Sequence, residues 1–345
     1  MLKKVTLPDT FFISLILPVH NEAKSIIQCL DAILMQDYPV EQMEILVVDG
    51  ISTDETRQIV LEYQEDHPQI RLLDNPGRIV PTGLNAAIRQ STGQIIIRID
   101  GHTLITPDYV KKCLDTIKKT GADNVGGCMT AVGTTDFGKA VAIATSTPFG
   151  VGNSKFHYAT IMEEVDSVYM GAWPIDVFKR VGLFDEGLVR DQDDEFNYRL
   201  RENGGKIILN PEITSVYTTR STPFSLWRQY FQYGFYKVRV LQKHPRQMSI
   251  RQFVPPGFVL SLLAGLILAV ILPWGWIPLF VIAGGYLAAN LTASLITAVK
   301  KGWKHLWLLP VTFVILHLSY GLGFLCGLVK FWNRWGDKVG KVPQL

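Results

Sequence analysis

The sequence has almost no acidic residues in its last third. Of 31 aspartates and glutamates among 345 residues, only Asp337 lies beyond Glu212. Fourteen lysines and arginines lie from Arg220 onward, so this part carries a formal charge of +13, whereas the part before it carries −10. Because these bases flank apolar runs and do not line a polar face, the asymmetry predicts an acidic globular domain followed by a basic, membrane-facing region. It disfavours nucleic-acid binding.

The sequence also lacks cysteines at paired spacings. Its four cysteines, Cys29, Cys113, Cys128 and Cys326, are scattered, which favours a reducing compartment and argues against a zinc site. The N-terminal segment MLKKVTLPDTFF lacks the apolar core of a signal peptide. We therefore expect the first domain to lie in the cytoplasm.

Charge is absent from three long apolar runs, at about 254–272, 277–299 and 306–329. Each is close to the ~20 residues that cross a bilayer, and tryptophans near their ends are typical of interfacial anchors. We predict a multi-pass protein of the cell (inner) membrane. It would have basic, aromatic interfacial helices at 220–252, about three transmembrane spans within 253–330, and a basic tail at 331–345.

The topology of the last span stays open. With the first domain in the cytoplasm, the lysine-containing loop at 300–305 also lies inside, as the positive-inside tendency favours. The tail, with Lys330, Arg334, Lys338 and Lys341, would then fall outside, against that tendency. Either the last span does not fully cross, or two spans form a re-entrant hairpin through LPWGWIP.

Strand and helix patterns alternate through the first part of the chain. Apolar segments at 12–16, EILVVD, IRLLD and QIIIRID are separated by helical patterns, and Ser52 and Glu55 have the spacing of a capping box. The alternation predicts an α/β domain over residues 1–219 with a mixed, mainly parallel sheet. Ligands of such sheets gather at the carboxyl ends of strands, where Asp49 and Asp100 lie.

The strand QIIIRID is apolar enough to be buried, yet Asp100, Gly101 and His102 end it. A carboxylate and an imidazole at a strand end can hold a divalent cation, which neutralises the charge that develops on a diphosphate leaving group. The alternative is that His102 is a loop histidine that makes a hydrogen bond. Two-residue alternation places Arg98 on the same face as Asp100, where a structural ion pair is the favoured role.

A second cluster of acids lies in RDQDDEFNYRL, with Asp191, Asp193, Asp194 and Glu195. Crowded carboxylates raise the proton affinity of at least one of them, which suits a general base. Negative charge also stabilises the start of a helix. The two roles are compatible if different acids fill them.

Four segments together carry a family resemblance: ISLILPVHNE, ILVVDGISTDET, GLNAAIRQSTGQIIIRIDGH and DQDDEFNYRL. In order and spacing they resemble the family-2 glycosyltransferases with the GT-A fold, and most of all the glucosyltransferases of succinoglycan-type exopolysaccharide synthesis. The likeness covers about residues 12–245 well and the apolar runs loosely. It implies inverting, metal-dependent transfer of a sugar, with glucose expected, from a UDP-sugar to a polyprenyl-diphosphate-linked glycan.

The resemblance also implies a donor and metal site. Asp49 would accept the imide N–H of uracil, although Asp49-Gly50 replaces the two adjacent aspartates common in the family and weakens the ribose contact. Asp100 and His102 would hold the metal, and the imidazole in place of a second aspartate favours Mn²⁺ over Mg²⁺. The full set of expected donor-binding residues is Pro18, His20, Glu22, Asp49, Arg78, Asn85 and Asp100.

On the acceptor side, the resemblance places Asp193 at the catalytic aspartate, with Asp191 as the second candidate and Gln192 in place of the usual glutamate. Gly171 and Trp173 match the loop under the acceptor sugar, where Trp173 either stacks on a pyranose or packs in the core. Arg228, Gln232 and Lys237 belong to an expected interfacial helix, and the resemblance adds that they meet the diphosphate of the lipid-linked acceptor; the two roles are compatible.

The expected partners are therefore a nucleotide sugar, a lipid-linked oligosaccharide, membrane lipid and, as a possibility, other polysaccharide-assembly proteins. Two alternatives remain open. One is a processive polysaccharide synthase. The other is a catalytically inactive, membrane-anchored nucleotide-binding protein, which Gly50 and Gln192 keep in consideration.

Overall fold

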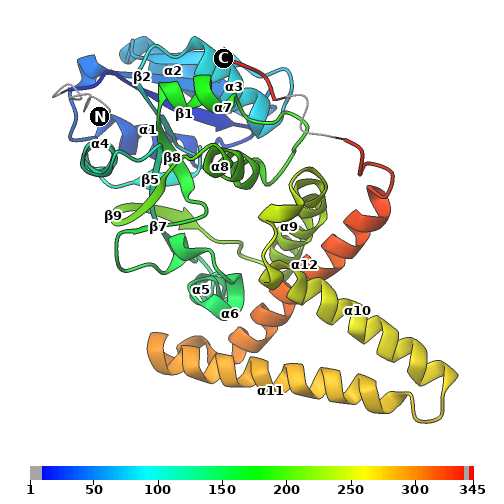
Figure 1. Cartoon of the computed structure of the whole chain (residues 1–345). Coiled ribbons are helices and arrows are strands. Elements are labelled where there is room, and N and C mark those ends of the chain that lie inside the picture. Colours follow the sequence, from blue (N-terminus) through cyan, green and yellow to red (C-terminus); the bar gives the residue numbers. More distant parts are fainter. Residues whose placement is uncertain (1–9, 338–341) are drawn as a thin grey trace. The chain divides into compact units, whose positions relative to one another are not determined.

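The structure is a computed structural model that describes residues 10–337 and 342–345 (Figure 1). Most of the N-terminal segment considered above, and Lys338 and Lys341 of the tail, lie outside these residues. Contacts divide the chain into two compact units, Met1–Thr130 with Tyr158–Tyr217 and Lys341–Leu345, and Ala131–His157 with Thr218–Gly340. The predicted boundary near residue 219 stays a prediction, because residues 131–157 group with the C-terminal unit and the chain end groups with the first.

One mixed sheet forms the centre of the first unit. Its strand order is β3-β2-β1-β4-β8-β6-β9-β5, and β7 pairs with β9. Strands β1 (Ile13–Val19), β2 (Met43–Asp49), β3 (Ile70–Asp74) and β4 (Ile95–Arg98) are parallel to their neighbours in this group. The antiparallel part contains β5 (Thr103–Ile105), β6 (Asn124–Val132), β7 (Glu163–Glu164), β8 (Tyr169–Pro174) and β9 (Ile207–Thr218). The predicted mixed sheet is confirmed.

Helices of the first unit connect these strands. They are α1 (Ile26–Leu34), α2 (Thr56–Asp66), α3 (Val80–Gln90), α4 (Tyr109–Thr120), α7 (Ile175–Val181) and α8 (Gln192–Glu202), with a short 3-10 turn η1 (Val40–Gln42). The predicted capping box is absent at α2. Its N-cap is Glu55, without a side-chain hydrogen bond, because the Ser52 hydroxyl donates to Asp49 instead.

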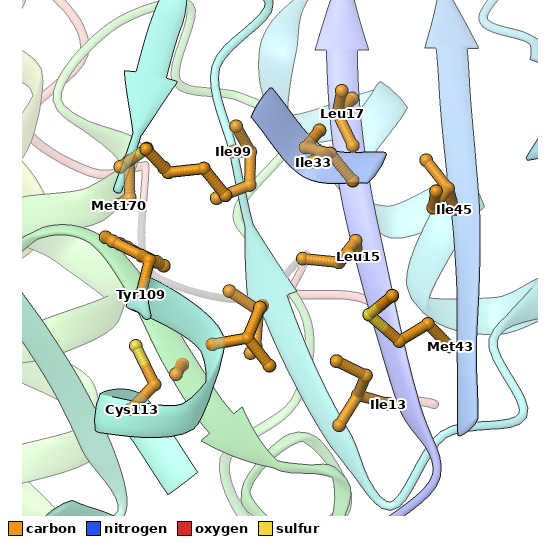
Figure 2. Close-up of a cluster of buried hydrophobic side chains, with 14 of the residues drawn as sticks. Ile13, Leu15, Leu17, Ile33, Met43, Ile45, Ile99, Tyr109, Cys113 and Met170 are labelled. Atoms are coloured by element: carbon orange, nitrogen blue, oxygen red, sulfur yellow. The ribbon is translucent and has the colours of Figure 1, made fainter. Parts of the chain in front are cut away.

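Alternation along the parallel strands decides which side chains enter the core. Ile13, Leu15 and Leu17 of β1 point to one face, together with Ile33 of α1 and Tyr109 of α4 (Figure 2). The β4 residues at positions 95 and 97, and position 99 just after it, belong to the same buried cluster. Residues 98 and 100, which alternate with these three positions, therefore lie on the opposite face of the sheet.

The second unit is helical. It contains α5 (Asp136–Thr145), α6 (Pro148–Val151), α9 (Pro223–Lys243), α10 (Ile250–Ile271), α11 (Trp276–Lys301) and α12 (Leu309–Lys330), with 3-10 turns η2 (Lys155–His157), η3 (Pro245–Gln247) and η4 (Trp303–Leu308). Three helical segments of the described chain, Ile250–Ile271, Trp276–Lys301 and Trp303–Lys330, are long and apolar enough to cross a membrane. The span prediction is confirmed to that extent.

Glycines let α9 and α12 approach closely. A Cβ at Gly323 or Gly327 of α12 would overlap the carbonyl oxygens of Phe231 and Phe235 of α9, and one at Gly234 would overlap the carbonyl oxygen of Tyr320. Small residues at four-residue spacing allow helix backbones to come together in this way. The pair is consequently a packed unit, whereas Gly284 of α11 has open space around it.

We expect Gly323→Ala to lower the thermal midpoint of the detergent-solubilised protein by several degrees. The added methyl group meets backbone and must displace one helix, at a cost of about 1–3 kcal/mol. Gly284→Ala is the matched control, since it brings the same gain in helix propensity without a clash. Equal midpoints for the two variants would show that α9 and α12 are not packed as described.

Candidate active site

The carboxyl ends of β1, β2 and β4 gather the predicted donor and metal residues within the first unit. Strand β1 leads into the loop that carries Glu22, β2 ends at Asp49, and β4 is followed by Asp100. Helix α8 adds Asp193, which an ion pair joins to Arg98 at the end of β4. The structure thus brings together four of the residues on which the predicted chemistry depends.

Asp49 is held rigidly at the end of β2. Its side chain is 1% exposed, and Oδ1 accepts hydrogen bonds from the backbone N–H of Ser52 at 3.1 Å and from its hydroxyl at 2.6 Å. Arg57 lies between Asp49 and Asp74, at 3.4 and 2.6 Å. These contacts fix the direction of the carboxylate before any ligand binds.

The loops after β1 and β2 are tied to each other. The Asn21 N–H donates to the Ser52 hydroxyl at 2.9 Å, and the Asn21 side-chain oxygen accepts from the Thr53 N–H at 2.8 Å. His20 Nδ1 lies 2.9 Å from the Gly50 carbonyl oxygen. Gly50, where the family often has a second aspartate, therefore supplies a backbone partner for His20. Pro18 is part of β1, in register with Val48.

His102 is oriented by a carboxylate. Its Nδ1 lies 2.9 Å from Glu22 Oε1, and Glu22 Oε2 accepts from Ser25 at 2.9 Å. The edge of the imidazole also meets the Tyr217 ring, with centroids 5.8 Å apart. Histidines that bind metals commonly have a carboxylate on the second ring nitrogen, which fixes the tautomer and raises the basicity of the ligating nitrogen. Glu22 occupies that position here.

Arg98 joins the two predicted chemical groups. It is 5% exposed, its Nε donates to Asp100 Oδ1 at 2.8 Å, and its Nη1 donates to Asp193 Oδ1. The predicted structural ion pair of Arg98 is thus present, and it is a bridge between two carboxylates. Gly171 of β8 lies opposite Arg98 in the sheet.

The two carboxylates have opposite pKa shifts. Burial tends to raise the pKa of Asp100, but Arg98, followed by His102, outweighs burial and holds it below its usual value. Burial raises the pKa of Asp193 to about 6, against the opposing effect of Arg98 and with added repulsion from Asp100 and Asp194. Asp100 is thus ionised at neutral pH, and Asp193, which shares its Arg98 partner, titrates near neutral pH.

The donor atoms around Asp100 suit a divalent cation that also takes ligands from a substrate. Within residues 10–337 and 342–345, no group of three or more histidine, cysteine, aspartate or glutamate side chains is arranged to hold a metal. Asp100 offers an ionised carboxylate and His102 an oriented imidazole, so diphosphate oxygens and water would have to complete the coordination. The pair fits a metal that arrives with a nucleotide.

The acidic residues at the start of α8 have separate roles. Glu195 is fully buried and holds Arg199 through two contacts of 2.9 and 3.0 Å, while Arg199 also donates to the carbonyl oxygens of Val181 and Leu183. Asp191 is the N-cap of α8 in a left-handed conformation. Asp193, in the first turn, is the residue that contacts Arg98, which favours it over Asp191 as the reactive carboxylate.

Asn85 does not have the predicted donor-binding position. It is fully buried, donates to the Phe184 carbonyl and to Glu186 at 2.9 Å each, and accepts from the Phe184 N–H. Its polar atoms secure the loop before α8, and the expected contact with a donor is wrong. Arg78, by contrast, is exposed in a left-handed backbone conformation, and its donor role stays a prediction.

Trp173 packs in the core and offers no face to a sugar. It is 1% exposed, and the rings of Phe178, Phe184 and Phe196 surround it. Gly171 explains how it fits, because a Cβ there would meet the indole. Of the two roles considered for Trp173, packing is the one found.

The remaining predicted acceptor residues lie on α9 in the second unit. Arg228 and Gln232 line a depression of about 500 Å³ together with aromatic side chains at 224, 227, 231, 235 and 236. Lys237 is only 4% exposed and does not line it. The acceptor role of Lys237 stays a prediction.

Tyr169 was missed by the sequence analysis. Its hydroxyl lies 2.8 Å from that of Thr103, and it also hydrogen-bonds Asp100, which lowers the pKa of that carboxyl further. Alternation gave no signal for it, because β8 is irregular there: its register with β6 shifts and Met170 has a positive φ of 57°.

Comparison with known proteins supplies the family. A sequence model of glycosyl transferase family 2 matches residues 14–174. Succinoglycan biosynthesis protein ExoA of Rhizobium meliloti (strain 1021) is 30% identical over 93% of this chain and 96% of its own length. The chain belongs to glycosyl transferase family 2.

Two further relatives extend this family assignment. A dolichyl N-acetyl-alpha-D-glucosaminyl phosphate 3-beta-D-2,3-diacetamido-2,3-dideoxy-beta-D-glucuronosyltransferase of Methanococcus voltae is 30% identical over 92% of this chain and 98% of its own. The mannosyltransferase PcManGT of Pyrobaculum calidifontis, solved with GDP-Man and Mn²⁺, has a TM-score of 0.58 at 21% identity over 92% of this chain and 87% of its own. This family 2 glycosyltransferase therefore has the expected GT-A type of fold.

We expect Arg98→Gln to destabilise this family 2 enzyme more at pH 7.5 than at pH 5. Loss of the guanidinium leaves two adjacent carboxylates, at a cost on the order of 3 kcal/mol when both are ionised. The pKa of Asp193, already about 6 beside Arg98, rises without it, so protonation removes the repulsion at pH 5. Thermal midpoints in detergent at the two pH values measure the difference.

Lys179→Gln is the matched control for this experiment. Its partner is Asp176 at 2.8 Å, and both side chains are exposed, so the pair contributes little at either pH. A loss for Arg98→Gln that is equal at both pH values would mean that the guanidinium acts by packing alone.

Proposed function

We propose that this enzyme moves a sugar, with glucose expected, from a UDP-sugar to a polyprenyl-diphosphate-linked glycan in cell-surface polysaccharide synthesis, with inversion at the anomeric carbon. The observation that carries the proposal is the Arg98 bridge, which sets a strand-end carboxylate beside one with a raised pKa. Similarity to a succinoglycan biosynthesis protein and to a glycosyltransferase named for a dolichyl-linked sugar phosphate supports the acceptor class.

Asp49 selects the base of the donor. A buried carboxylate held by Ser52 and Arg57 can accept the imide N–H of uracil. Amino groups of other bases would approach the Asp49 carboxylate with a different geometry. The fixed direction of this hydrogen-bond acceptor therefore discriminates uracil from the other bases. Pro18 of β1 and His20 of the loop that follows it then contact the base from the side.

Asp100 and His102 hold Mn²⁺ or, less favourably, Mg²⁺ together with the donor diphosphate. When bound, the cation neutralises charge on the departing UDP. Glu22 keeps the His102 ring directed, and Arg98 keeps Asp100 ionised. Glu22 and Arg98 thereby prepare the site at neutral pH without any proton transfer.

Asp193 takes the proton of the acceptor hydroxyl. A pKa of about 6 leaves the group mostly ionised at neutral pH and still basic enough to accept a proton, which is the compromise a general base needs. The ion pair with Arg98 holds one carboxylate oxygen, so the direction of the second oxygen is restricted. In-line attack then requires no covalent intermediate on the enzyme.

The acceptor lipid meets the basic, aromatic surface of α9 at the cytoplasmic face of the inner membrane. Arg228 and Gln232 lie among aromatic side chains in the depression described above. Arginine suits a diphosphate, and aromatic side chains suit the membrane interface.

The function is tested by incubating membranes that contain the protein with Mn²⁺ and a panel of radiolabelled UDP-sugars. We expect label from one UDP-sugar, UDP-glucose first, to appear in the lipid extract as a single added residue. Asp193→Asn should lower kcat about 10²–10⁴-fold with little change in the KM of the donor. The wild-type kcat/KM should rise with pH to a plateau, with a midpoint at about pH 6 or lower when cation is bound.

Asp194→Asn is the control, because it removes a carboxylate from the same turn of α8 without removing the Arg98 contact. Full activity of Asp193→Asn, or transfer from no UDP-sugar at all, would rule out the proposed reaction. A ladder of products would indicate a processive synthase.

We further expect His102→Asp to shift the metal preference toward Mg²⁺. The change replaces nitrogen by oxygen at one ligand, and Mg²⁺ favours oxygen ligands more strongly than Mn²⁺ does. The measurement is the concentration of each metal that gives half-maximal transfer, with His67→Asp at the end of α2 as the control. An unchanged ratio between the two metals would remove His102 from the metal site.

A further inference from the structure

The end of the chain lies on the catalytic unit. The Leu183 N–H donates to the Pro343 carbonyl oxygen at 2.8 Å. At Gly182, the residue before it, an added Cβ would lie 2.8 Å from Val342 and 3.1 Å from Gln344. Residues 342–345 belong to the same compact unit as the sheet, and Figure 1 shows the C-terminus close to α7. The tail is therefore on the same side of any membrane as the active site.

This placement limits the number of membrane crossings. A chain whose catalytic unit and C-terminal end lie on one side crosses the membrane an even number of times. Three apolar helical segments follow the catalytic sheet, so they cannot all cross.

Burial separates α12 from the two apolar helices before it. Half of the most apolar window in Trp303–Lys330 is buried, against 17% for α10 and 11% for α11. The exposed surface of α10 and α11 is rich in leucine, isoleucine, valine and phenylalanine, as contact with lipid requires. Much of the surface of α12 is instead covered by protein.

Helix α9 covers α12 along its length, while α10 meets it at Gly321 and α11 meets it at His317. Near their first turns, Leu226 shares a buried cluster with Leu309 and Phe313. Further along, Phe231 meets Gly323 and Phe235 meets Gly327. At the far end the Gln242 side chain donates to the Phe331 carbonyl oxygen at 2.7 Å. Residue numbers rise together on both helices, so the two run parallel and side by side.

Helix α9 is too charged to lie in the hydrocarbon core. It carries Arg228, Lys237, Arg239 and Lys243, and each cation at the centre of a bilayer costs roughly 2.5–3.5 kcal/mol on insertion scales. A crossing α12 would carry its parallel partner to the same depth. Both helices avoid this cost if they lie along the membrane surface.

The distribution of basic residues agrees with this arrangement. The turn between α10 and α11, at 272–275, has no charge, whereas Arg251 precedes α10, Lys300 and Lys301 end α11, and Lys330 ends α12. If only α10 and α11 cross, every one of these cations lies on the catalytic side. The conflict between the basic tail and the positive-inside tendency then disappears.

We propose that α10 and α11 cross the membrane as a hairpin and that α12 does not cross but lies with α9 along the catalytic face of the membrane. Both ends of the apolar region, and the C-terminus, are then on the side of the active site. The proposal concerns topology and does not depend on the identity of the donor or acceptor.

The test uses full-length single-cysteine variants in a Cys128→Ser, Cys326→Ser background that keeps the buried Cys29 and Cys113. The variants are Trp274→Cys in the α10–α11 turn, Lys301→Cys and Lys330→Cys before and after α12, and Leu345→Cys at the chain end. Each is labelled with a membrane-impermeant maleimide in sealed vesicles of either orientation, and in detergent to give the maximum. Protein yield and gel-filtration profile monitor folding.

We expect Lys301→Cys, Lys330→Cys and Leu345→Cys to react from one face only and Trp274→Cys to react only from the other. Labelling of Lys301→Cys and Lys330→Cys from opposite faces would show that α12 crosses and would overturn the proposal. Labelling of all four from one face would show that the hairpin does not cross, which also overturns it. The Lys301–Lys330 comparison stands even if a substitution at Leu345 disturbs the tail.

Discussion

The candidate site depends on one buried cation. Arg98 enters the structure on a strand whose neighbouring residues are core, and it is stable there because Asp100 and Asp193 accept its hydrogen bonds from two different elements. A buried ion pair of this kind adds little net stability, but removal of one partner is costly. The three side chains are therefore interdependent: Arg98 favours the ionised form of both carboxylates, and the carboxylates keep its guanidinium charged. Arg98 lowers the pKa of both carboxylates, and it outweighs burial at Asp100 but not at Asp193, so the two pKa values shift in opposite directions.

Several residues in the segments around this cluster have strained backbone conformations, and buried contacts of neighbouring segments hold them in place. The non-glycine residues with positive φ in the described chain are Asn21, Ile51, Arg78, Met170 and Asp191, and each lies in a segment that carries or adjoins a predicted site residue. Such conformations cost of order 1–3 kcal/mol each and persist only where the surroundings enforce them. The Glu195–Arg199 pair, Asn85 and the aromatic cluster around Trp173 provide that enforcement, since each fixes a loop next to the site by buried contacts.

Sequence periodicity predicted the features that depend only on residues close together in the chain. Alternation placed Arg98 and Asp100 on one face, and the strand patterns placed Asp49 and Asp100 at the carboxyl ends of parallel strands, as found. Partners distant in sequence were beyond such reasoning: 95 positions separate Arg98 from Asp193, and 99 separate Asn85 from Phe184. Ser52 shows the reason, because the capping box and the bond to Asp49 use the same hydroxyl and only the tertiary fold decides between them. The role of Trp173 was similarly undecidable, since an indole suits both a sugar face and a core.

The distinction between local sequence pattern and tertiary surroundings also applies to the apolar C-terminal helices. The apolar segments Trp276–Lys301 and Trp303–Lys330, which contain α11 and α12, are nearly equal in length and hydropathy, so composition alone predicts the same membrane position for both. Their surroundings differ, because α12 has glycines at the positions where α9 approaches and α11 does not. Glycines at these positions allow another helix to pack closely, whereas they give no such contact on a face that meets only lipid chains. In this chain, the glycine face of α12 that contacts the charged helix α9 distinguishes α12 from α11, whereas hydropathy does not.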